Sequence, residues 1–116
     1  MKRTVALVAV VLLAGCSQAP AAHAVAGCAS PAATGTVTVT AAVLDGRADP
    51  APHRVSIPLG ATVQVQVTAD RVLPVHIHGY DREYDAPGCA AFTADRAGLF
   101  DVEAHPDTLL VQLEVR

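Results

Sequence analysis

The sequence predicts an all-β protein, an antiparallel β-sandwich of about seven strands, and three observations lead to this prediction. From residue 36 onward, valines alternate with polar side chains at the period of two that is typical of strands. Gly, Pro and Asp separate these runs at short, regular spacing. No helical period appears after the N-terminal leader. Many short strands joined by turns are typical of a β-sandwich.

Each strand follows from its own alternation. The runs expected to form strands are residues 36–44, 54–57, 61–69, 73–80, 89–94, 99–105 and 109–116. Residues 45–53 and 81–88, which are rich in Asp, Gly and Pro, are expected to form loops. The apolar faces of the three most regular strands are predicted to contain Val63, Val65, Val67, Phe100, Val102, Ala104, Leu109, Val111, Leu113 and Val115.

The N-terminus has the layout of a secretory signal, with a short basic start followed by an apolar run. The run is shorter than the roughly 20 residues that a membrane span needs. The residues "LAGC", which end at Cys16, resemble the lipobox of bacterial lipoproteins. That resemblance implies a signal peptide over 1–15, a lipidated tether over 16–35 and a folded domain over 36–116. It also implies attachment to the extracytoplasmic face of the cell membrane through lipid on Cys16.

The charge balance argues against a nucleic-acid partner. The whole chain carries eight basic and eleven acidic residues, for a formal net charge of −3. Removal of the leader takes away Lys2 and Arg3, which leaves six arginines against eleven acids and a formal charge of −5. The arginines are scattered rather than clustered, so no basic patch is expected. The sequence contains no hydrolase triad, phosphate loop or catalytic carboxylate pair, and we expect the protein not to be an enzyme.

Cys28 and Cys89 remain after Cys16 is assigned to the lipid. Outside the cytoplasm, two remaining cysteines are expected to form a disulfide. The alternative is that one of them supplies a thiolate to a metal ion.

The segment "PVHIHGYD", residues 74–81, carries the candidate chemistry. Alternation in a strand places His76 and His78 on one face, about 7 Å apart at Cα, and Tyr80 is a candidate to join them. Val75 and Ile77 are expected to point into the core. Two neutral imidazoles at this spacing suit copper, zinc or nickel. The alternative is a pair of solvated histidines with no ligand.

The runs "SIPLGATVQVQVTAD", "PVHIHGYD", "AFTADRAGLFDVEAH" and "LLVQLEVR" together resemble the cupredoxin family over about residues 36–116. This resemblance implies a Greek-key β-sandwich. It also implies copper ligands from the 76–78 segment and from the loop that joins the last two strands, which here contains His105. The predicted metal ligands are therefore His76, His78 and His105, with copper as the expected ion and zinc as the alternative.

This sequence departs from the family at the blue-copper ligands. The position of the family's cysteine falls at Ala104, and the last loop contains no methionine. A blue-copper centre needs that thiolate. The expected function is therefore metal capture, buffering or sensing rather than electron transfer, with Glu103 or Asp81 as a further oxygen donor.

Two alternatives remain open. One is a metal-free cupredoxin-like module that binds a protein partner at the cell envelope. The other is an oxidoreductase, because "HIHGYD" also resembles the copper segment of copper–zinc superoxide dismutases. Against the second, His105 is the sole histidine after Asp81, and that family needs more.

Overall fold

The structure, a computed structural model, describes residues 27–29 and 32–116 and consists of β-strands. The strands are β1 (Val37–Leu44), β2 (Arg47–Asp49), β3 (His53–Ile57), β4 (Thr62–Ala69), β5 (Leu73–Ile77), β6 (Arg82–Ala86), β7 (Gly88–Thr93), β8 (Gly98–Ala104) and β9 (Thr108–Val115). The described residues form no helix of the length and apolarity needed to cross a membrane.

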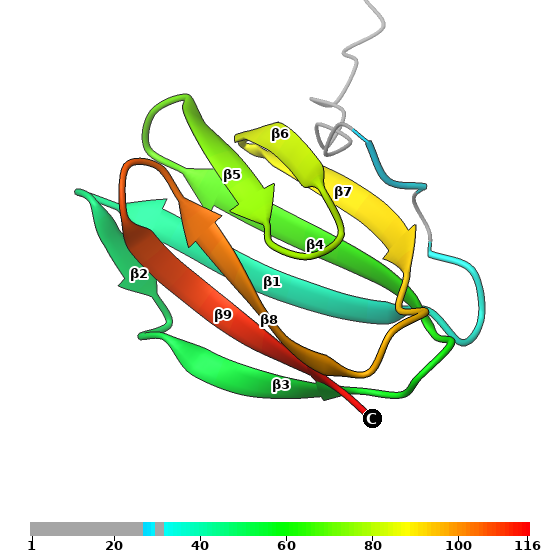
Figure 1. The fold of residues 1–116 in the computed structure, drawn as a ribbon. Helices are drawn as coiled ribbons and strands as arrows, with labels where there is room; N and C mark the ends of the chain where they lie inside the picture. The colour runs from blue at the N-terminus through cyan, green and yellow to red at the C-terminus, as the bar shows by residue number, and fades with distance from the viewer. Residues whose placement is uncertain (1–26, 30–31) are drawn as a thin grey trace, which may run out of the picture.

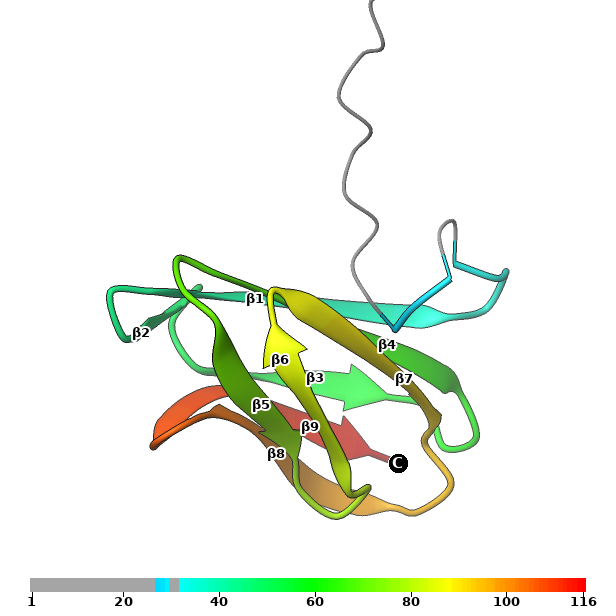
Figure 2. The same ribbon diagram turned by 90° about the horizontal axis from the view of Figure 1, so that it is seen from above.

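The strands form two sheets that pack face to face (Figures 1 and 2). One sheet has the order β2-β1-β4-β7, and the other has the order β3-β9-β8-β5-β6. The space between them is filled mainly by aliphatic side chains, and nine of the nineteen buried residues of this core cluster are valines. Val63, Val65 and Val67 of β4 are fully buried and pack in one cluster with residues of the opposite sheet. The predicted β-sandwich is therefore confirmed.

The prediction that all strands pair antiparallel was wrong for two pairs. β1 runs parallel to β4, and β3 runs parallel to β9. The chain reaches this arrangement because the segment after β2 leaves the first sheet and enters the second beside the C-terminal strand (Figure 1). Alternation reports which face of a strand is apolar but carries no information on the direction of its neighbour.

Two segments predicted as loops contain strands. Residues 45–53 include β2, which pairs with β1 through a two-residue turn at Asp45 and Gly46. Both turn residues have positive φ, 51° and 73°, as a type I′ hairpin requires. Residues 81–88 include β6, which pairs with β5 along its whole length. β6 is an edge strand, where charged side chains are tolerated and prevent pairing with other chains.

The apolar face predicted for the last strand needs one correction. The pairing of β8 with β9 shifts register between Val102 and Glu103, which pair with Val111 and Leu109. This irregularity leaves Leu110 unpaired in the ladder and fully buried, while Leu109 is partly exposed. A bulge of this kind changes the phase of alternation within one strand.

The predicted disulfide is confirmed, because Cys28 and Cys89 are bonded with a Cα–Cα distance of 5.6 Å. It holds the N-terminal segment against the outer face of the four-stranded sheet. There Gln64 Nε2 donates to the carbonyl oxygen of Ala29 at 3.3 Å, and Gln64 is 4% exposed. The signal peptide, His23 and Cys16 lie outside the described residues, so the lipid anchor and the domain limits stay predictions.

Candidate metal site on the outer face of the five-stranded sheet

The two histidines of the "HIH" segment lie side by side, as alternation predicts. Val75 and Ile77 of β5 are fully buried in the core, so His76 and the following His78 project from the opposite, outer face. Their imidazole ring centroids are 4.4 Å apart and the rings are tilted by 50°. His76 is half-buried and His78 is exposed. The imidazole rings of His76 and His78 therefore lie together on a face that solvent can reach.

His78 has a carboxylate partner on the neighbouring strand. Its Nε2 donates a hydrogen bond to Glu103 Oε2 of β8 at 2.9 Å, with both side chains still partly exposed. A proton held on Nε2 leaves the lone pair on Nδ1 of the neutral ring, which can then bind a metal. Carboxylates that accept from the second ring nitrogen are the usual partners of metal-binding histidines, because they fix the tautomer and orient the ring.

Strand register places a second glutamate beside the pair. His76 is the central residue of a row across three strands, opposite Glu83 of β6 on one side and Glu103 of β8 on the other. Directly opposed residues in a sheet project to the same face. The sequence reasoning missed Glu83 because residues 81–88 were predicted to be a loop.

His105 lies at the other end of β5 from His78. Its backbone N–H donates to the carbonyl oxygen of Pro74 at 2.9 Å, two positions beyond the paired His76 and Glu103. The side chain is exposed. Within residues 27–29 and 32–116, no three or more His, Cys, Asp or Glu side chains are arranged to hold a metal ion as they stand. The structure therefore brings His76 and His78 together, and the three-histidine set stays a prediction.

Tyr80, named as a candidate neighbour of the histidines, lies elsewhere. Its ring packs between Phe92 and Phe100, with centroid distances of 4.5 and 4.7 Å, and its hydroxyl donates to the carbonyl oxygen of Arg96 at 3.0 Å. The Arg96 guanidinium lies 5.1 Å from the centre of the Tyr80 ring, a cation–π contact. The tyrosine thus holds the β5–β6 turn against the β7–β8 loop and has a structural role. Asp81 lines the pocket beside it, and its role as an oxygen donor stays a prediction.

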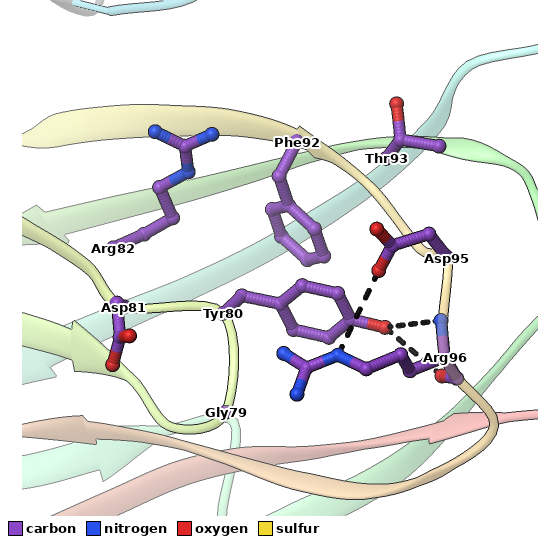
Figure 3. A pocket seen from close by; sticks show the side chains of 8 residues that line it. All are labelled: Gly79, Tyr80, Asp81, Arg82, Phe92, Thr93, Asp95 and Arg96. Carbon is purple, nitrogen blue, oxygen red and sulfur yellow. Dashed lines mark hydrogen bonds and ion pairs between the residues drawn. The ribbon is translucent and has the colours of Figure 1, made fainter.

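Tyr80, Phe92 and Arg96 line a pocket of about 430 Å³ at that end of the sandwich (Figure 3). Its charged lining is balanced, because Arg82 and Arg96 are matched by Asp81 and Asp95. Asp95 pairs with Arg96 at 3.8 Å. Neither histidine of the pair lines it.

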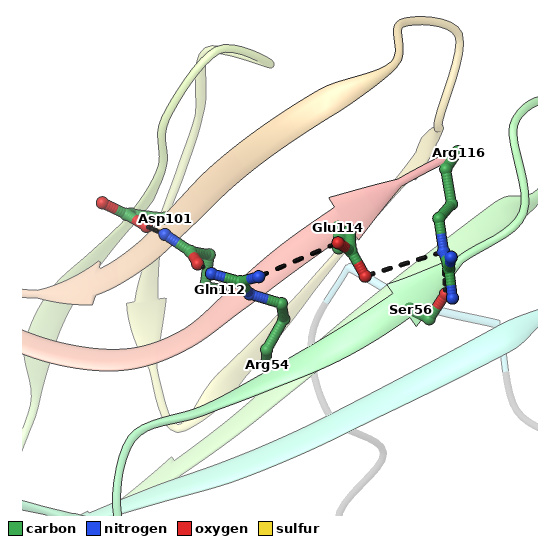
Figure 4. A network of polar contacts seen from close by, with 6 residues as sticks. All are labelled: Arg54, Ser56, Asp101, Gln112, Glu114 and Arg116. Atoms are coloured by element: carbon green, nitrogen blue, oxygen red, sulfur yellow. Dashed lines mark hydrogen bonds and ion pairs between the residues drawn. The ribbon is translucent and has the colours of Figure 1, made fainter.

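Another part of the outer face carries a network of polar side chains that bind one another (Figure 4). Arg54 Nε donates to Gln112 Oε1, and Gln112 Nε2 donates to Asp101 Oδ1, each at 2.9 Å. Glu114 lies between Arg54 and Arg116, at 3.8 and 3.6 Å. Asp101 and Glu114 therefore already have partners, in contrast to Glu83, for which the described residues show no hydrogen bond or ion pair.

Solved structures with this arrangement of strands are known at low sequence identity. A copper-binding protein solved by NMR in its apo form matches with a TM-score of 0.57 at 11% identity, over 72% of this chain and 91% of that one. A reduced variant of amicyanin matches with a TM-score of 0.54 at 16% identity, over 78% and 90%. The chain has a cupredoxin-like fold. No protein-family model matches the sequence, and no curated protein does.

A third structure with this cupredoxin-like fold belongs to a larger assembly. It is a chain of a heme-copper terminal oxidase dimer, with a TM-score of 0.55 at 19% identity. The match covers 69% of the present chain and 65% of the oxidase chain, so the present chain spans less than two thirds of that protein. At such identities the likeness concerns the fold, and the chemistry must be argued from this chain's own residues.

Within this cupredoxin-like fold, the residues do not fit a blue-copper site. Ala104, at the position that the sequence resemblance assigns to the copper thiolate, is fully buried and pairs with the equally buried Val75. Both face the core, whereas His76 and Glu103, their neighbours in sequence, face solvent. A thiolate–imidazole centre at Ala104 has no donors here. The imidazoles of His76 and His78 and the carboxylate of Glu103 lie instead on the outer face.

Proposed function

We propose that this protein is a cupredoxin-like protein, anchored by lipid to the extracytoplasmic face of the cell membrane, that binds copper through His76 and His78. Its role is to capture, buffer or sense the metal, and not to carry electrons as a blue-copper protein does. The observation that carries the proposal is the pair of imidazoles 4.4 Å apart on an exposed strand face, one of them hydrogen-bonded to Glu103.

The chemistry of this pair supports a binding role. Imidazole nitrogen is a good ligand for Cu(II) and Zn(II), and the Glu103 carboxylate gives His78 a defined tautomer. The pair lies on the surface, so a bound ion would keep positions open to solvent and could be exchanged with a partner. Electron transfer at a blue-copper centre would need a thiolate, and Ala104 supplies none.

His105 is the third ligand that the sequence predicts. It lies on the same outer side of the sheet but beyond Pro74, so its participation requires the loop after β8 to bring the ring toward His76. Zinc is the alternative ion, since the same donors bind it. Titration of His105→Ala and of the wild-type chain with Cu(II) and with Zn(II) tests the role of His105 and the identity of the ion.

The test is a Cu(II) titration of the purified full-length chain in detergent, followed by calorimetry and electron paramagnetic resonance. We expect one ion per chain with nitrogen hyperfine coupling and no blue absorption. His76→Ala and His78→Ala should each weaken binding by about tenfold or more. His53→Ala is the matched control, because His53 is exposed and its ring contacts the carbonyl oxygen of Ala51 in its own loop. Equal affinity in all three variants would contradict the proposal.

The membrane attachment has its own test. Cys16→Ala should move the protein from the membrane fraction to the soluble fraction and abolish labelling with a fatty-acid analogue. If the wild-type chain binds no metal in the titration, His76 and His78 have a structural role. The polar outer face is then the surface to test for binding of a protein partner at the cell envelope.

A further inference from the structure

We infer that Glu83 of β6 is the oxygen ligand of the metal site, which is then a two-histidine, one-carboxylate site selective for divalent ions over Cu(I). This inference rests on the proposed function, because it names a further ligand of the same site. Neither the sequence pattern nor the structural matches assign any role to this residue.

The position of Glu83 is set by backbone pairing. β5 and β6 pair antiparallel with His76 directly opposite Glu83, and the next outward pair along these strands is Pro74 with Asp85. Side chains at opposed positions of an antiparallel pair have Cβ atoms about 4.5–5.5 Å apart. The glutamate chain is long enough to bring its carboxylate to an ion held by the two rings.

The Glu83 carboxylate is also available. Three other acids on this face have partners: Asp101 accepts from Gln112 and Glu114 lies between two arginines (Figure 4), and Glu103 accepts from His78. The described residues offer no partner to Glu83 or Asp85, and of these two it is Glu83 that pairs with His76. Glu83 is exposed on an edge strand, and the part of the chain that the structure describes offers it no hydrogen bond or ion pair. Its side chain can therefore rotate toward His76 without breaking an existing contact.

The donor set determines which ion is bound. Two imidazoles and one carboxylate form a set of nitrogen and oxygen ligands, which suits Cu(II) and Zn(II). Cu(I) prefers thiolate and thioether ligands, and among the described residues neither type lies beside the pair. Glu103 then acts as a positioning residue, since it holds the proton on His78 Nε2 and leaves Nδ1 for the metal. With three protein ligands, a fourth position stays open to water or to an incoming ligand.

The experiment compares Glu83→Gln with Asp85→Asn in the full-length protein. Both variants remove one negative charge from the outer face of the same edge strand, so their general electrostatic effects are matched. We expect Glu83→Gln to weaken Cu(II) and Zn(II) binding by about tenfold and Asp85→Asn by less than about twofold. The electron paramagnetic resonance parameters of the Cu(II) complex should change in Glu83→Gln and not in Asp85→Asn. Circular dichroism of each variant checks that the fold is kept.

The failures of the two proposals are distinguishable. Equal Cu(II) affinity in Glu83→Gln and Asp85→Asn, with binding still lost in His76→Ala, would overturn the role of Glu83 and leave the histidine site intact. Absence of Cu(II) binding in the wild-type chain would overturn the proposed function, and the ligand role with it. Tighter binding of Cu(I) than of Cu(II), measured by competition with a Cu(I)-specific chelator, would overturn the predicted selectivity.

Discussion

Replacement of Gly79 by alanine tests whether the turn after the histidines is built around the aromatic cluster. Gly79 has φ +82°, and a Cβ at this position would lie 2.5 Å from Cδ1 and 2.7 Å from Cε1 of Phe100. The Phe100 ring is held against Tyr80 at a centroid distance of 4.7 Å, so it cannot move aside without disturbing that contact. The alanine methyl must therefore displace the turn or the ring.

The expected cost has two parts. A left-handed conformation costs a non-glycine residue about 1–2 kcal/mol. Insertion of a methyl group into a packed site adds about 1–3 kcal/mol. Gly79→Ala should therefore lower the free energy of unfolding by about 2–5 kcal/mol. Gly46→Ala is the control, because Gly46 has φ +73° but a Cβ there would meet nothing within 4 Å. That control should lose about 1–2 kcal/mol.

Urea denaturation, followed by circular dichroism, measures both variants under the same conditions. A shift in midpoint at constant slope reports a change in stability alone. Gly79→Ala should lose about 1–3 kcal/mol more of the free energy of unfolding than Gly46→Ala. Equal losses would show that Phe100 yields freely and that the glycine of the "HGYD" segment serves backbone conformation alone.

Two further predictions concern stability. Replacing Cys28 and Cys89 together by serine should lower the free energy of unfolding by about 4 kcal/mol, since the bond closes a loop with a sequence separation of 61 residues; an unchanged urea midpoint would contradict this. Burial raises the pKa of Tyr84 above its ordinary value of 10.0, while its hydroxyl donates to Val65. The folded state thus holds this proton more tightly, so its contribution is complete below about pH 10 and falls by about 1.4 kcal/mol per pH unit above it. Tyr84→Phe should lack that alkaline loss, which urea titrations from pH 9 to 11 would measure.

The core and the histidine face could be predicted from the sequence because both depend on the period of two. Val63, Val65 and Val67 are buried where alternation places them, and His76 and His78 share a face for the same reason. These properties are local, since they follow from the geometry of a single strand. The Asp45-Gly46 pair also indicated a turn in the sequence, but the segment that contains it was predicted to be a loop rather than a hairpin.

The features that were missed depend on neighbours that a single strand does not specify. Residues 81–88 were predicted to be a loop from their Asp, Gly and Pro content, whereas Arg82–Ala86 form β6 at the edge of the sheet. Tyr80 follows the alternation of His76 and His78 in sequence, but β5 ends at Ile77 and the turn carries the tyrosine to the aromatic cluster. The position of Glu83 beside His76 likewise follows from the pairing of β5 with β6, which the alternation of residues within one strand does not reveal.

Ala104 occupies the position that the cupredoxin resemblance assigns to a copper-binding cysteine, so this chain has the fold without that ligand. Ala104→Cys would restore a thiol at the position that the resemblance assigns to the copper ligand, but the side chain would face the core beside Val75. His76 and His78 project from the other face of the strand, so the sheet itself lies between thiol and imidazoles. We expect Cu(II) to give this variant no blue thiolate–copper band and to bind the histidine face as before, while the added sulfur costs about 1–3 kcal/mol of stability. An intense blue band would show that β5 and β8 can present both sets of ligands to one ion, and would overturn the assignment of the metal site to the outer face.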